Sequence, residues 1–332
     1  MPELRKDPVV DRWVIISEER AARPMSKWVK ARNAAEEEAF CPFCEGNEES
    51  TPPEVLSFRD DGSQADKPGW RLRAVPNKFP ALRWDGDVKI ETDGVYEKVN
   101  GVGVHEVIIE TPRHDEQLAC LPTERMADLF RAARMRILEF KRDKRLNCVQ
   151  FFKNHGPESG ASLNHSHSQI IAMPVASKHI KEEIYGSRRC YIEIGKCVYC
   201  DIIDKSLARG ERIILENADF VAIAPFAPRF AYETLILPKE HSHRFEEIED
   251  DAVDSLAEIF GELMKRVNAL LDSPPYNMML HTAPFDSANG ESYHWHVELM
   301  PVLTRVAGFE WGSGFHINPV APEEAARLLR KV

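Results

Sequence analysis

The sequence predicts a mixed α and β protein built from two related halves. The chain has 332 residues, roughly twice the ~150 residues of an average domain. Each half holds one long amphipathic segment typical of a helix, residues 121–145 and 250–271, between short apolar or alternating runs typical of strands. One order of motifs also occurs in both halves. We therefore expect two domains, residues 1–190 and 191–332.

The first half contains one expected long helix, and Thr123 stands where an N-cap residue is preferred. The apolar spacing along this helix predicts a buried stripe of Met126, Leu129, Phe130, Met135 and Leu138. A basic loop is expected at residues 19–28 and a turn-rich stretch at 41–54. Strands are expected at residues 13–17, 104–112, 147–156 and 167–175.

The second half repeats this order. A C-x-x-C pair, strands, a histidine after a proline, a long helix, a strand, a loop and an H-x-H pair follow one another as in the first half. His114 and His165 are separated by nearly the same distance as His241 and His294. Strands are expected at residues 212–217, 220–226, 232–241, 276–284 and 294–302. We interpret the chain as a pseudo-duplication with an insertion in its first half.

The composition disfavours several classes of protein. There are 54 acidic against 43 basic residues, a net charge of −11, which makes the chain a poor general binder of nucleic acid. No apolar run approaches the ~20 residues that span a bilayer, so no membrane partner is expected. The N-terminal residues lack the apolar core of a signal peptide, and we expect a cytoplasmic protein whose thiols stay reduced.

Four of the seven cysteines form two C-x-x-C pairs, which suit a structural zinc site because one turn supplies two thiolate ligands. Histidines at matching places complete each set, and CPFCEGN enters a turn rather than the helix start of a redox motif. We expect two structural zinc sites. The first comprises Cys41, Cys44, His114 and His165; the second comprises Cys197, Cys200, His241 and His294. In the second, His243 competes with His241 and His296 with His294. His281 is expected to be a satisfied strand histidine, and Cys120, Cys148 and Cys190 to be ordinary thiols.

The most informative stretch surrounds the first H-x-H pair. Residues i and i+2 of a strand share a face, so His165, His167 and Gln169 should project together. His165 can then be held by metal while the neutral imidazole of His167 attacks phosphorus. The preceding Gly/Ser-rich loop can offer backbone N–H groups and hydroxyls to phosphate oxygens. With Asn154 and Ser162 nearby, this pattern predicts nucleotidyl transfer through a phosphorylated histidine.

The second H-x-H pair differs at one telling position. Glu298 stands where the first half has Gln169, and a carboxylate beside a phosphate would repel it. We expect the second half to do structural or acceptor-side work.

Several segments together resemble one known family over nearly the whole chain. They are the ARP loop, CPFC, VPNKFPAL, TPRH, the SxxHxHxQ core and the terminal GFEWGSGFHINPVAPEEAARLLR. The chain resembles the galactose-1-phosphate uridylyltransferases of the histidine-triad superfamily, in a branch that also resembles plant ADP-glucose phosphorylase. The resemblance implies an α+β fold of two histidine-triad-like domains, with antiparallel half-barrel sheets and packed helices. It also implies a homodimer in which a second subunit completes each site.

The resemblance also assigns roles to residues. His167 looks like the nucleophile, and Gln169, Ser162 and Asn154 look like the residues that hold its phosphate. Further substrate contacts are implied for Arg20 and Arg23 near the phosphates, Asn77 and Phe79 at the nucleoside, and Glu310 at the sugar. The chain departs from the best-known members in having H-S-H rather than H-P-H, a second C-x-x-C, and no C-terminal Lys and Tyr loop. The nucleobase and the acceptor therefore stay open.

We expect a ping-pong nucleotidylyltransferase acting on a UDP- or ADP-hexose and on hexose-1-phosphate or phosphate. The first alternative is an ADP-glucose phosphorylase, which transfers an adenylyl group to phosphate. A second is a histidine-triad nucleotide hydrolase, disfavoured because such hydrolases favour a third histidine where Gln169 stands. A zinc-binding interaction or nucleic-acid module is disfavoured by the charge. No catalytic metal is expected.

Overall fold

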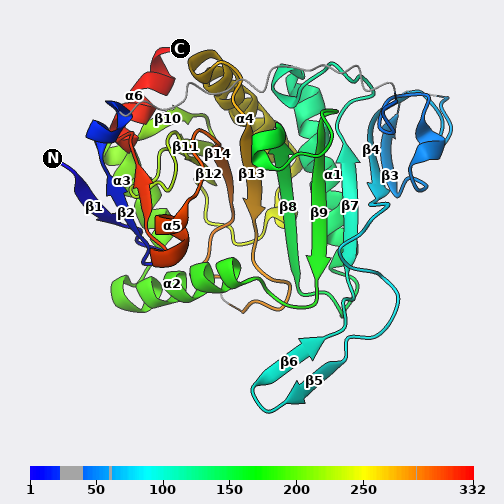
Figure 1. Ribbon diagram of the computed structural model, residues 1–332, viewed down its shortest axis with the longest axis horizontal. Coiled ribbons are helices and arrows are strands. Elements are labelled where there is room, and N and C mark those ends of the chain that lie inside the picture. The colour runs from blue at the N-terminus through cyan, green and yellow to red at the C-terminus, as the bar shows by residue number, and fades with distance from the viewer. Residues whose placement is uncertain (23–39, 60–61, 289) are drawn as a thin grey trace.

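The computed structural model describes residues 1–22, 40–59, 62–288 and 290–332. Its centre is a ten-stranded sheet in which every pairing is antiparallel (Figure 1). The first half contributes β3 (Leu56–Arg59), β4 (Trp70–Pro76), β7 (Val104–Ile109), β8 (Cys148–His155) and β9 (His167–Met173). The second contributes β10 (Ile213–Glu216), β11 (Phe220–Ile223), β12 (Thr234–Pro238), β13 (Tyr276–His281) and β14 (His296–Pro301).

The two halves meet in the middle of this sheet. The strand order is β10-β11-β12-β14-β13-β8-β9-β7-β4-β3, so each half supplies five strands in mirrored order. At the seam, Tyr276 pairs with His155 and Leu280 with Phe151. The expected α+β fold with antiparallel sheets and packed helices is confirmed. The division between residues 190 and 191 stays a prediction, and it falls within α2 (Lys178–Ile194).

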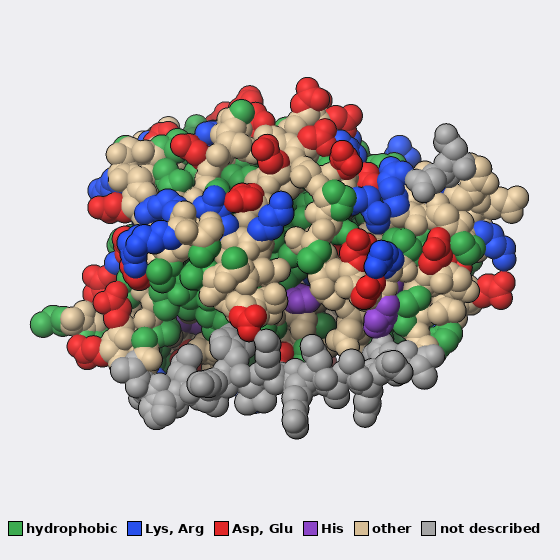
Figure 2. All heavy atoms as spheres, turned by 90° about the horizontal axis from the view of Figure 1, so that it is seen from above, with side chains coloured by type: hydrophobic (Ala, Val, Ile, Leu, Met, Phe, Trp, Pro, Cys, Tyr) green, Lys and Arg blue, Asp and Glu red, His purple; other side chains and the backbone are tan. Residues whose placement is uncertain are grey.

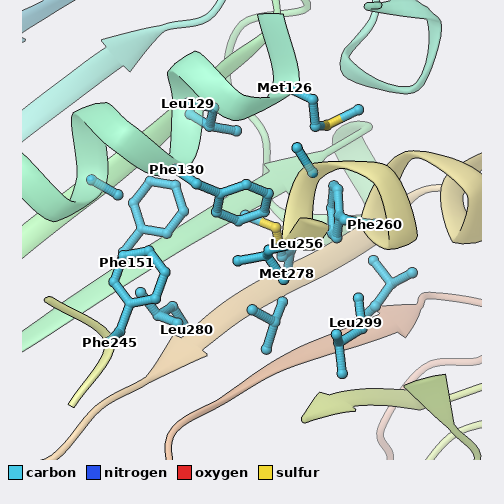
Figure 3. Close-up of a cluster of buried hydrophobic side chains, with 14 of the residues drawn as sticks. Met126, Leu129, Phe130, Phe151, Phe245, Leu256, Phe260, Met278, Leu280 and Leu299 are labelled. Atoms are coloured by element: carbon cyan, nitrogen blue, oxygen red, sulfur yellow. The ribbon is translucent and has the colours of Figure 1, made fainter. Parts of the chain in front are cut away.

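Two long helices, α1 (Thr123–Phe140) and α4 (Asp250–Leu271), pack against each other on one face of the sheet. The ring of Phe130 meets that of Phe260 edge to face, with centroids 5.4 Å apart. Buried side chains from strands of both halves complete one shared core, including Phe151, Met278 and Leu299 (Figure 3). Continuous burial of this kind is what stabilises a single core across two related halves.

Three details of α1 differ from the sequence prediction. The helix begins at Thr123 itself, and Pro122 is the N-cap. It ends at Phe140 rather than at residue 145. Met135 and Leu138 are 43% and 42% exposed, so they do not belong to the buried stripe. The buried face instead continues through Ala133 and Ile137.

The remaining elements surround this body. A three-stranded sheet joins the two ends of the chain through β1 (Glu3–Lys6), β2 (Trp13–Ile16) and β15 (His316–Asn318). The hairpin β5 (Ile90–Asp93) and β6 (Tyr96–Val99) projects away from the sheet in Figure 1. Further helices are α3 (Val198–Arg209), α5 (Gly308–Ser313) and α6 (Pro322–Lys331). None of the described helices is long and apolar enough to cross a membrane.

Candidate functional site

The first-half H-x-H segment leads into β9, which lies between β7 and β8. Ile109 pairs with His167, and Val107 pairs with Gln169. On β8, Phe152 pairs with Gln169, so Asn154 stands two residues further along, opposite His167. Strand alternation places His167 and Gln169 on one face of β9, while Ser168 and Ile170 face the helices. The predicted nucleophile and its amide neighbour therefore share one face.

His167 is held with one ring nitrogen available. Its Nδ1 lies 2.7 Å from the carbonyl oxygen of His165, and a carbonyl can only accept, so Nδ1 carries the proton. Nε2 is then left with its lone pair. The side chain is buried, with 7% of the residue exposed. Burial lowers the pKa of His167, and the nearby charge of Lys153 lowers it further, which keeps the imidazole neutral.

The other face of β9 lies over a fully buried ion pair. Lys153 Nζ donates to Glu110 Oε2 at 2.8 Å, to Ser166 Oγ at 3.0 Å and to the carbonyl of His167 at 3.0 Å. Ser166 and Ser168 both donate to the same Glu110 carboxylate. Burial would raise the pKa of Glu110, but the Lys153 charge and these hydrogen bonds hold it below its usual range. The two serines of H-S-H-S thus tie the strand of His167 to a buried charge pair that the sequence did not reveal.

The first-half Cys/His group brings together the four predicted ligands Cys41, Cys44, His114 and His165, whose donor atoms all lie within 4.8 Å of one another. Cys44 Sγ lies 3.5 Å from His114 Nδ1 and 3.6 Å from His165 Nδ1. His165 Nε2 lies 2.7 Å from the carbonyl of Thr111, so Nε2 carries the proton and Nδ1 turns a lone pair towards the thiols. Soft sulfur and imidazole donors in a closed set of four fit zinc.

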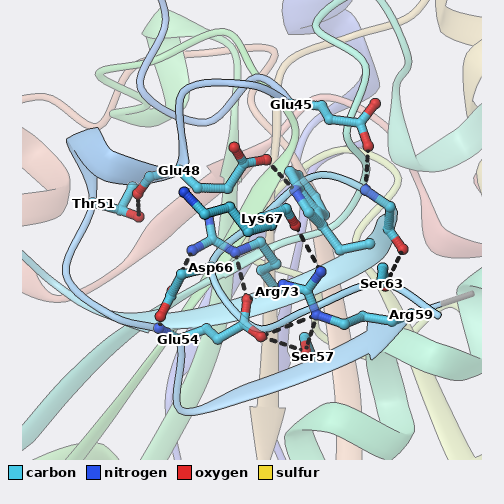
Figure 4. A network of polar contacts seen from close by, with 12 residues as sticks. Glu45, Glu48, Thr51, Glu54, Ser57, Arg59, Ser63, Asp66, Lys67 and Arg73 are labelled. Carbon is cyan, nitrogen blue, oxygen red and sulfur yellow. Dashed lines mark hydrogen bonds and ion pairs between the residues drawn. The ribbon is translucent and has the colours of Figure 1, made fainter.

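The loop that carries Cys41 and Cys44 also touches the predicted nucleophile. Phe43, between the two cysteines, meets the ring of His167 edge to face with centroids 5.3 Å apart. The chain beyond this loop is braced by polar contacts. Glu48 accepts from Trp70 Nε1 at 2.7 Å, and buried Arg73 donates to Glu54 Oε2 at 2.9 Å (Figure 4). A metal that fixes this loop would therefore also fix one wall beside His167.

The second-half Cys/His group repeats the arrangement with Cys197, Cys200, His241 and His294, again with all donor atoms within 4.8 Å. Cys200 Sγ lies 3.3 Å from His241 Nδ1 and 3.7 Å from His294 Nδ1. The Nε2 atoms face carbonyls, that of His294 at 2.9 Å from Pro238 O and that of His241 at 2.7 Å from Gly290 O. The competing residue His296 instead stacks on His281, with ring centroids 4.6 Å apart. This donor set also fits zinc.

Of the predicted phosphate ligands, Asn154 lies opposite His167 on the neighbouring strand β8. The oxygen Oδ1 of Asn154 accepts from Asn277 Nδ2 at 2.8 Å. Ser162 is exposed in the loop that leads to β9. That loop turns through Gly156 and Gly160, both at positive φ, which only glycine adopts readily.

The predicted nucleoside contact Asn77 reaches Gln169 through His105, a residue to which the sequence analysis assigned no role. His105 Nε2 lies 2.8 Å from Gln169 Oε1 and 3.1 Å from Asn77 Nδ2. Asn77 Oδ1 accepts from the backbone N–H of Phe79 at 2.8 Å, and the Phe79 ring is largely in solvent, the residue being 85% exposed. The GVHEV segment contained the signal, since His105 lies on the strand that pairs with β9.

Two predicted substrate residues that the structure describes do not join this group. Arg20 lies in the short 3-10 helix η1 (Glu18–Ala22), and Glu310 lies in α5, where its carboxylate accepts from the N–H of Ala307. Within the described part of the chain, neither side chain contacts His167 or Gln169. Arg23 lies outside the described residues.

The second half places ion pairs where the first half has its predicted nucleophile. Glu298 pairs with Arg229, and His281 Nδ1 lies 2.9 Å from Glu183 Oε1. Burial alone would lower the pKa of His281, but Glu183 raises it to about 10. The polar side-chain atoms of His179, Glu183 and His281 also lie within 4.8 Å of one another, but a protonated His281 has no lone pair to offer a cation. His281 is thus a charged partner of Glu183, a role that its strand position did not suggest.

The face viewed in Figure 2 shows histidine side chains between mixed acidic and basic groups, with Lys and Arg in several small clusters. This distribution is consistent with the acidic composition. It places the positive charge of this face in local groups that suit small anions better than a long polyanion.

Comparisons with known proteins find the same group of relatives along the chain. The family model "Galactose-1-phosphate uridyl transferase, C-terminal domain" matches residues 149–320, and the model "DUF4931 N-terminal domain", of unknown function, matches residues 77–175. ADP-glucose phosphorylase of Arabidopsis thaliana is 36% identical over 337 residues, covering 100% of this chain and 93% of that protein. Galactose-1-phosphate uridylyltransferase of Thermotoga maritima is 32% identical over 340 residues, covering 100% and 98%.

Solved structures give the same neighbours. The crystal structure of the Arabidopsis thaliana ADP-glucose phosphorylase with bound ADP-glucose superposes with a TM-score of 0.84 at 35% identity, covering 100% of this chain and 99% of that one. A structure of uridylyltransferase superposes with a TM-score of 0.78 at 27% identity, covering 100% and 98%.

Proposed function

The chain belongs to the galactose-1-phosphate uridylyltransferase family and is an enzyme of nucleotidyl transfer, and from that premise we propose its nucleophile, its substrates and its metals. The proposed reaction moves a nucleoside monophosphate between a nucleotide sugar and hexose-1-phosphate through His167. The single observation that carries the choice of nucleophile is that the uncharged Gln169 shares the strand face of His167, whereas Glu298, paired with Arg229, stands at the corresponding place beside His296. The hydrogen bond from His167 Nδ1 to the His165 carbonyl leaves Nε2 with its lone pair.

In the first half-reaction, Nε2 of His167 attacks the α-phosphorus of the nucleotide sugar. The bond from the α-phosphorus to the bridging oxygen breaks, hexose-1-phosphate leaves with that oxygen, and a nucleotidyl-histidine remains. In the second, a phosphate oxygen of another hexose-1-phosphate attacks the same phosphorus and the bond to Nε2 breaks. Because the imidazole is neutral and leaves readily, two smaller barriers replace one large barrier.

The proposed substrate contacts follow the chemistry of each group. Gln169, Asn154 and Ser162 donate uncharged hydrogen bonds to the phosphoryl oxygens, where they offset developing charge. Arg20 and Arg23 are proposed near the phosphates, Asn77 and Phe79 at the nucleoside, and Glu310 at the sugar. Phe79 is exposed, and Glu310 makes no contact with His167 among the described residues of its own chain. Both observations support a homodimer in which a second copy completes the site. We also propose a cytoplasmic location.

The two Cys/His groups are proposed to hold one structural zinc each. All four ligands of each group are protein side chains, which leaves no open position for substrate. When bound, the metal would supply rigid coordination. Within the chain, His165 then anchors the segment before β9, and Phe43 holds the ring of His167. His179, Glu183 and His281 are left as an ion-paired group that supports the second half.

Adenylyl transfer to phosphate is the second candidate, and it has a specific support. The Arabidopsis relative named ADP-glucose phosphorylase is 36% identical along this whole chain. Hydrolysis is disfavoured because the polar group after the H-x-H pair is Gln169, an amide that cannot take up a proton as a third histidine would.

Intact-mass measurement after separate incubation with UDP-glucose, UDP-galactose and ADP-glucose tests the proposal. We expect a uridylyl adduct in the wild-type chain and in His296→Ala, and none in His167→Ala. An adenylyl adduct from ADP-glucose alone would replace the main proposal with the second candidate. The absence of an adduct with every donor would overturn the covalent mechanism.

A further inference from the structure

Two carboxamides flank His167, and each already has its oxygen engaged. Gln169 Oε1 lies 2.8 Å from His105 Nε2, and Asn154 Oδ1 lies 2.8 Å from Asn277 Nδ2. We propose that His105 and Asn277 are positioning residues that lock both carboxamides with their NH2 groups towards the transferred phosphoryl group. The proposal rests on the proposed function, in which Gln169 and Asn154 contact that group.

The tautomer of His105 follows from a backbone donor. The N–H of Ala81 donates to His105 Nδ1 at 3.1 Å, and a backbone N–H cannot be reversed. Nδ1 therefore has the lone pair and the proton is on Nε2, which donates to Gln169 Oε1. Asn77 Nδ2 lies 3.1 Å from the same Nε2, and because both atoms then carry hydrogens, this contact is not a hydrogen bond. With its oxygen occupied, Gln169 turns its NH2 group away from His105.

The orientation of Asn277 follows from a second carbonyl. Its Nδ2 donates to the carbonyl of Ser159 at 3.0 Å as well as to Asn154 Oδ1, which uses both of its hydrogens. Asn277 pairs with Asn154 across the seam between β13 and β8. Within the described residues, the NH2 group of Asn154 has no hydrogen-bond partner. The second half thus orients a group of the first-half site.

The physical reason for the lock is the charge of the substrate. A carboxamide presents either two N–H donors or an oxygen with two lone pairs, and the two orientations differ little in shape. The oxygen would repel a phosphoryl oxygen, whereas the NH2 group stabilises it. Donors that are already oriented need no rearrangement as charge develops in the transition state.

The test replaces the partner of each carboxamide. Asn277→Asp keeps the shape of the side chain, removes both N–H donors and places a carboxylate against Asn154 and the carbonyl of Ser159. The Asn154 NH2 group then turns towards the carboxylate, and its oxygen turns towards the phosphoryl group. His105→Leu removes the donor to Gln169, and His105→Gln returns an N–H donor. Gln150→Glu is the matched control. Gln150 donates across the same seam to the carbonyl of Leu280 and has no part in the proposed site.

The measurement is the single-turnover rate of hexose-1-phosphate release, by rapid quench, with whichever of ADP-glucose and UDP-glucose forms the wild-type adduct. We expect Asn277→Asp and His105→Leu to slow it roughly 100-fold, as for loss of one oriented donor to a developing charge. The nucleotide-sugar concentration that gives half of the maximal rate should change by less than about threefold, because the lost hydrogen bond stabilises the transition state more than the bound substrate. His105→Gln should recover most of the rate, and Gln150→Glu should match wild type.

Two results would overturn the positioning role while leaving the proposed function intact. One is a wild-type rate in Asn277→Asp or His105→Leu. The other is an equal loss in Gln150→Glu, which would show that the seam acts only by stability. A wild-type chain that forms no adduct would instead refute the proposed function itself, so the two failures are distinguishable.

Discussion

Replacing Lys153 with Met should destabilise the chain severely, because it leaves the Glu110 carboxylate buried without its cation. Both side chains are essentially inaccessible, at 1% and 0% exposure, and their charged atoms are 2.8 Å apart. Ser166 and Ser168 would remain as the only donors to Glu110 among the contacts described. Removing one partner of a buried pair is destabilising by about 3–5 kcal/mol. That is a large part of a typical unfolding free energy of roughly 5–15 kcal/mol.

The double variant Lys153→Met/Glu110→Gln separates the ion pair from simple packing. A neutral amide at position 110 no longer needs a cation, so we expect it to recover about 2–3 kcal/mol of the loss in Lys153→Met. The matched control is Arg142→Met. Arg142 pairs with Glu139 at a similar distance of 2.8 Å, but the two side chains are 79% and 49% exposed. Loss of an exposed pair should change stability by less than about 1 kcal/mol.

The assay is urea denaturation at neutral pH, followed by tryptophan fluorescence and far-ultraviolet circular dichroism. The argument fails if Lys153→Met is destabilised no more than Arg142→Met. It also fails if the double variant is less stable than Lys153→Met, because a stranded carboxylate could then not be the cause. Lys153 donates to the carbonyl of His167, so the adduct-forming rate should fall in both Lys153 variants even where the fold is recovered.

Three further predictions concern the metals, the second half and pH. Elemental analysis should find two zinc ions per wild-type chain. The variants Cys44→Ser and Cys200→Ser should each hold one zinc ion, because each loses a ligand of one group. Two zinc ions in either variant would contradict the proposed ligand sets. His296→Ala should form the nucleotidyl adduct at a rate within about threefold of wild type, whereas His167→Ala should form none; equal loss in both would refute the division of labour between the halves. Burial lowers the pKa of His155 to about 4, so the unfolded chain takes up its proton first as the pH falls. Stability should therefore be unaffected by His155 above about pH 6.5 and fall by about 2–3 kcal/mol towards pH 4. His155→Phe, which keeps a ring against Tyr276, should flatten that profile in acid titrations, and an unchanged profile would exclude His155 as the cause.

Local patterns in the sequence predicted the parts of the site that depend on spacing. The two C-x-x-C pairs and their histidines come together in two groups of four, because each set recurs in the same order along a repeated unit. His167 and Gln169 share a strand face because alternation places them there. The strand and helix order of each half was predictable for the same reason.

The residues that sequence reasoning missed act across long separations in the chain. His105 reaches Gln169 only through the pairing of β7 with β9, and Asn277 reaches Asn154 only through the pairing of β13 with β8. From the sequence, Lys153 is an ordinary strand lysine and Glu110 a glutamate at the end of another strand. No local pattern predicts that the two strands bring these side chains together as an ion pair next to Ser166. The register between strands is set by the whole fold, so it cannot be predicted from local patterns in a single sequence.

The prediction of the buried face of α1 was partly wrong for a related reason. Met135 and Leu138 fit a helical stripe by spacing, but the helix buries Ala133 and Ile137 instead. Which of two apolar faces is buried depends on the partner helix. An alanine allows closer approach than a methionine, and periodicity alone does not distinguish them.

The seam between β8 and β13 has a consequence for synthesis of the chain. The two strands are about 120 residues apart in sequence, so β8 leaves the ribosome well before its partner exists. Until then, the first five strands form a sheet with an open edge of unpaired N–H and carbonyl groups, a template for pairing between nascent chains. A message truncated after the first half would therefore yield an aggregation-prone fragment rather than a smaller working enzyme. Quality control by chaperones would be needed most during translation of residues 191–281.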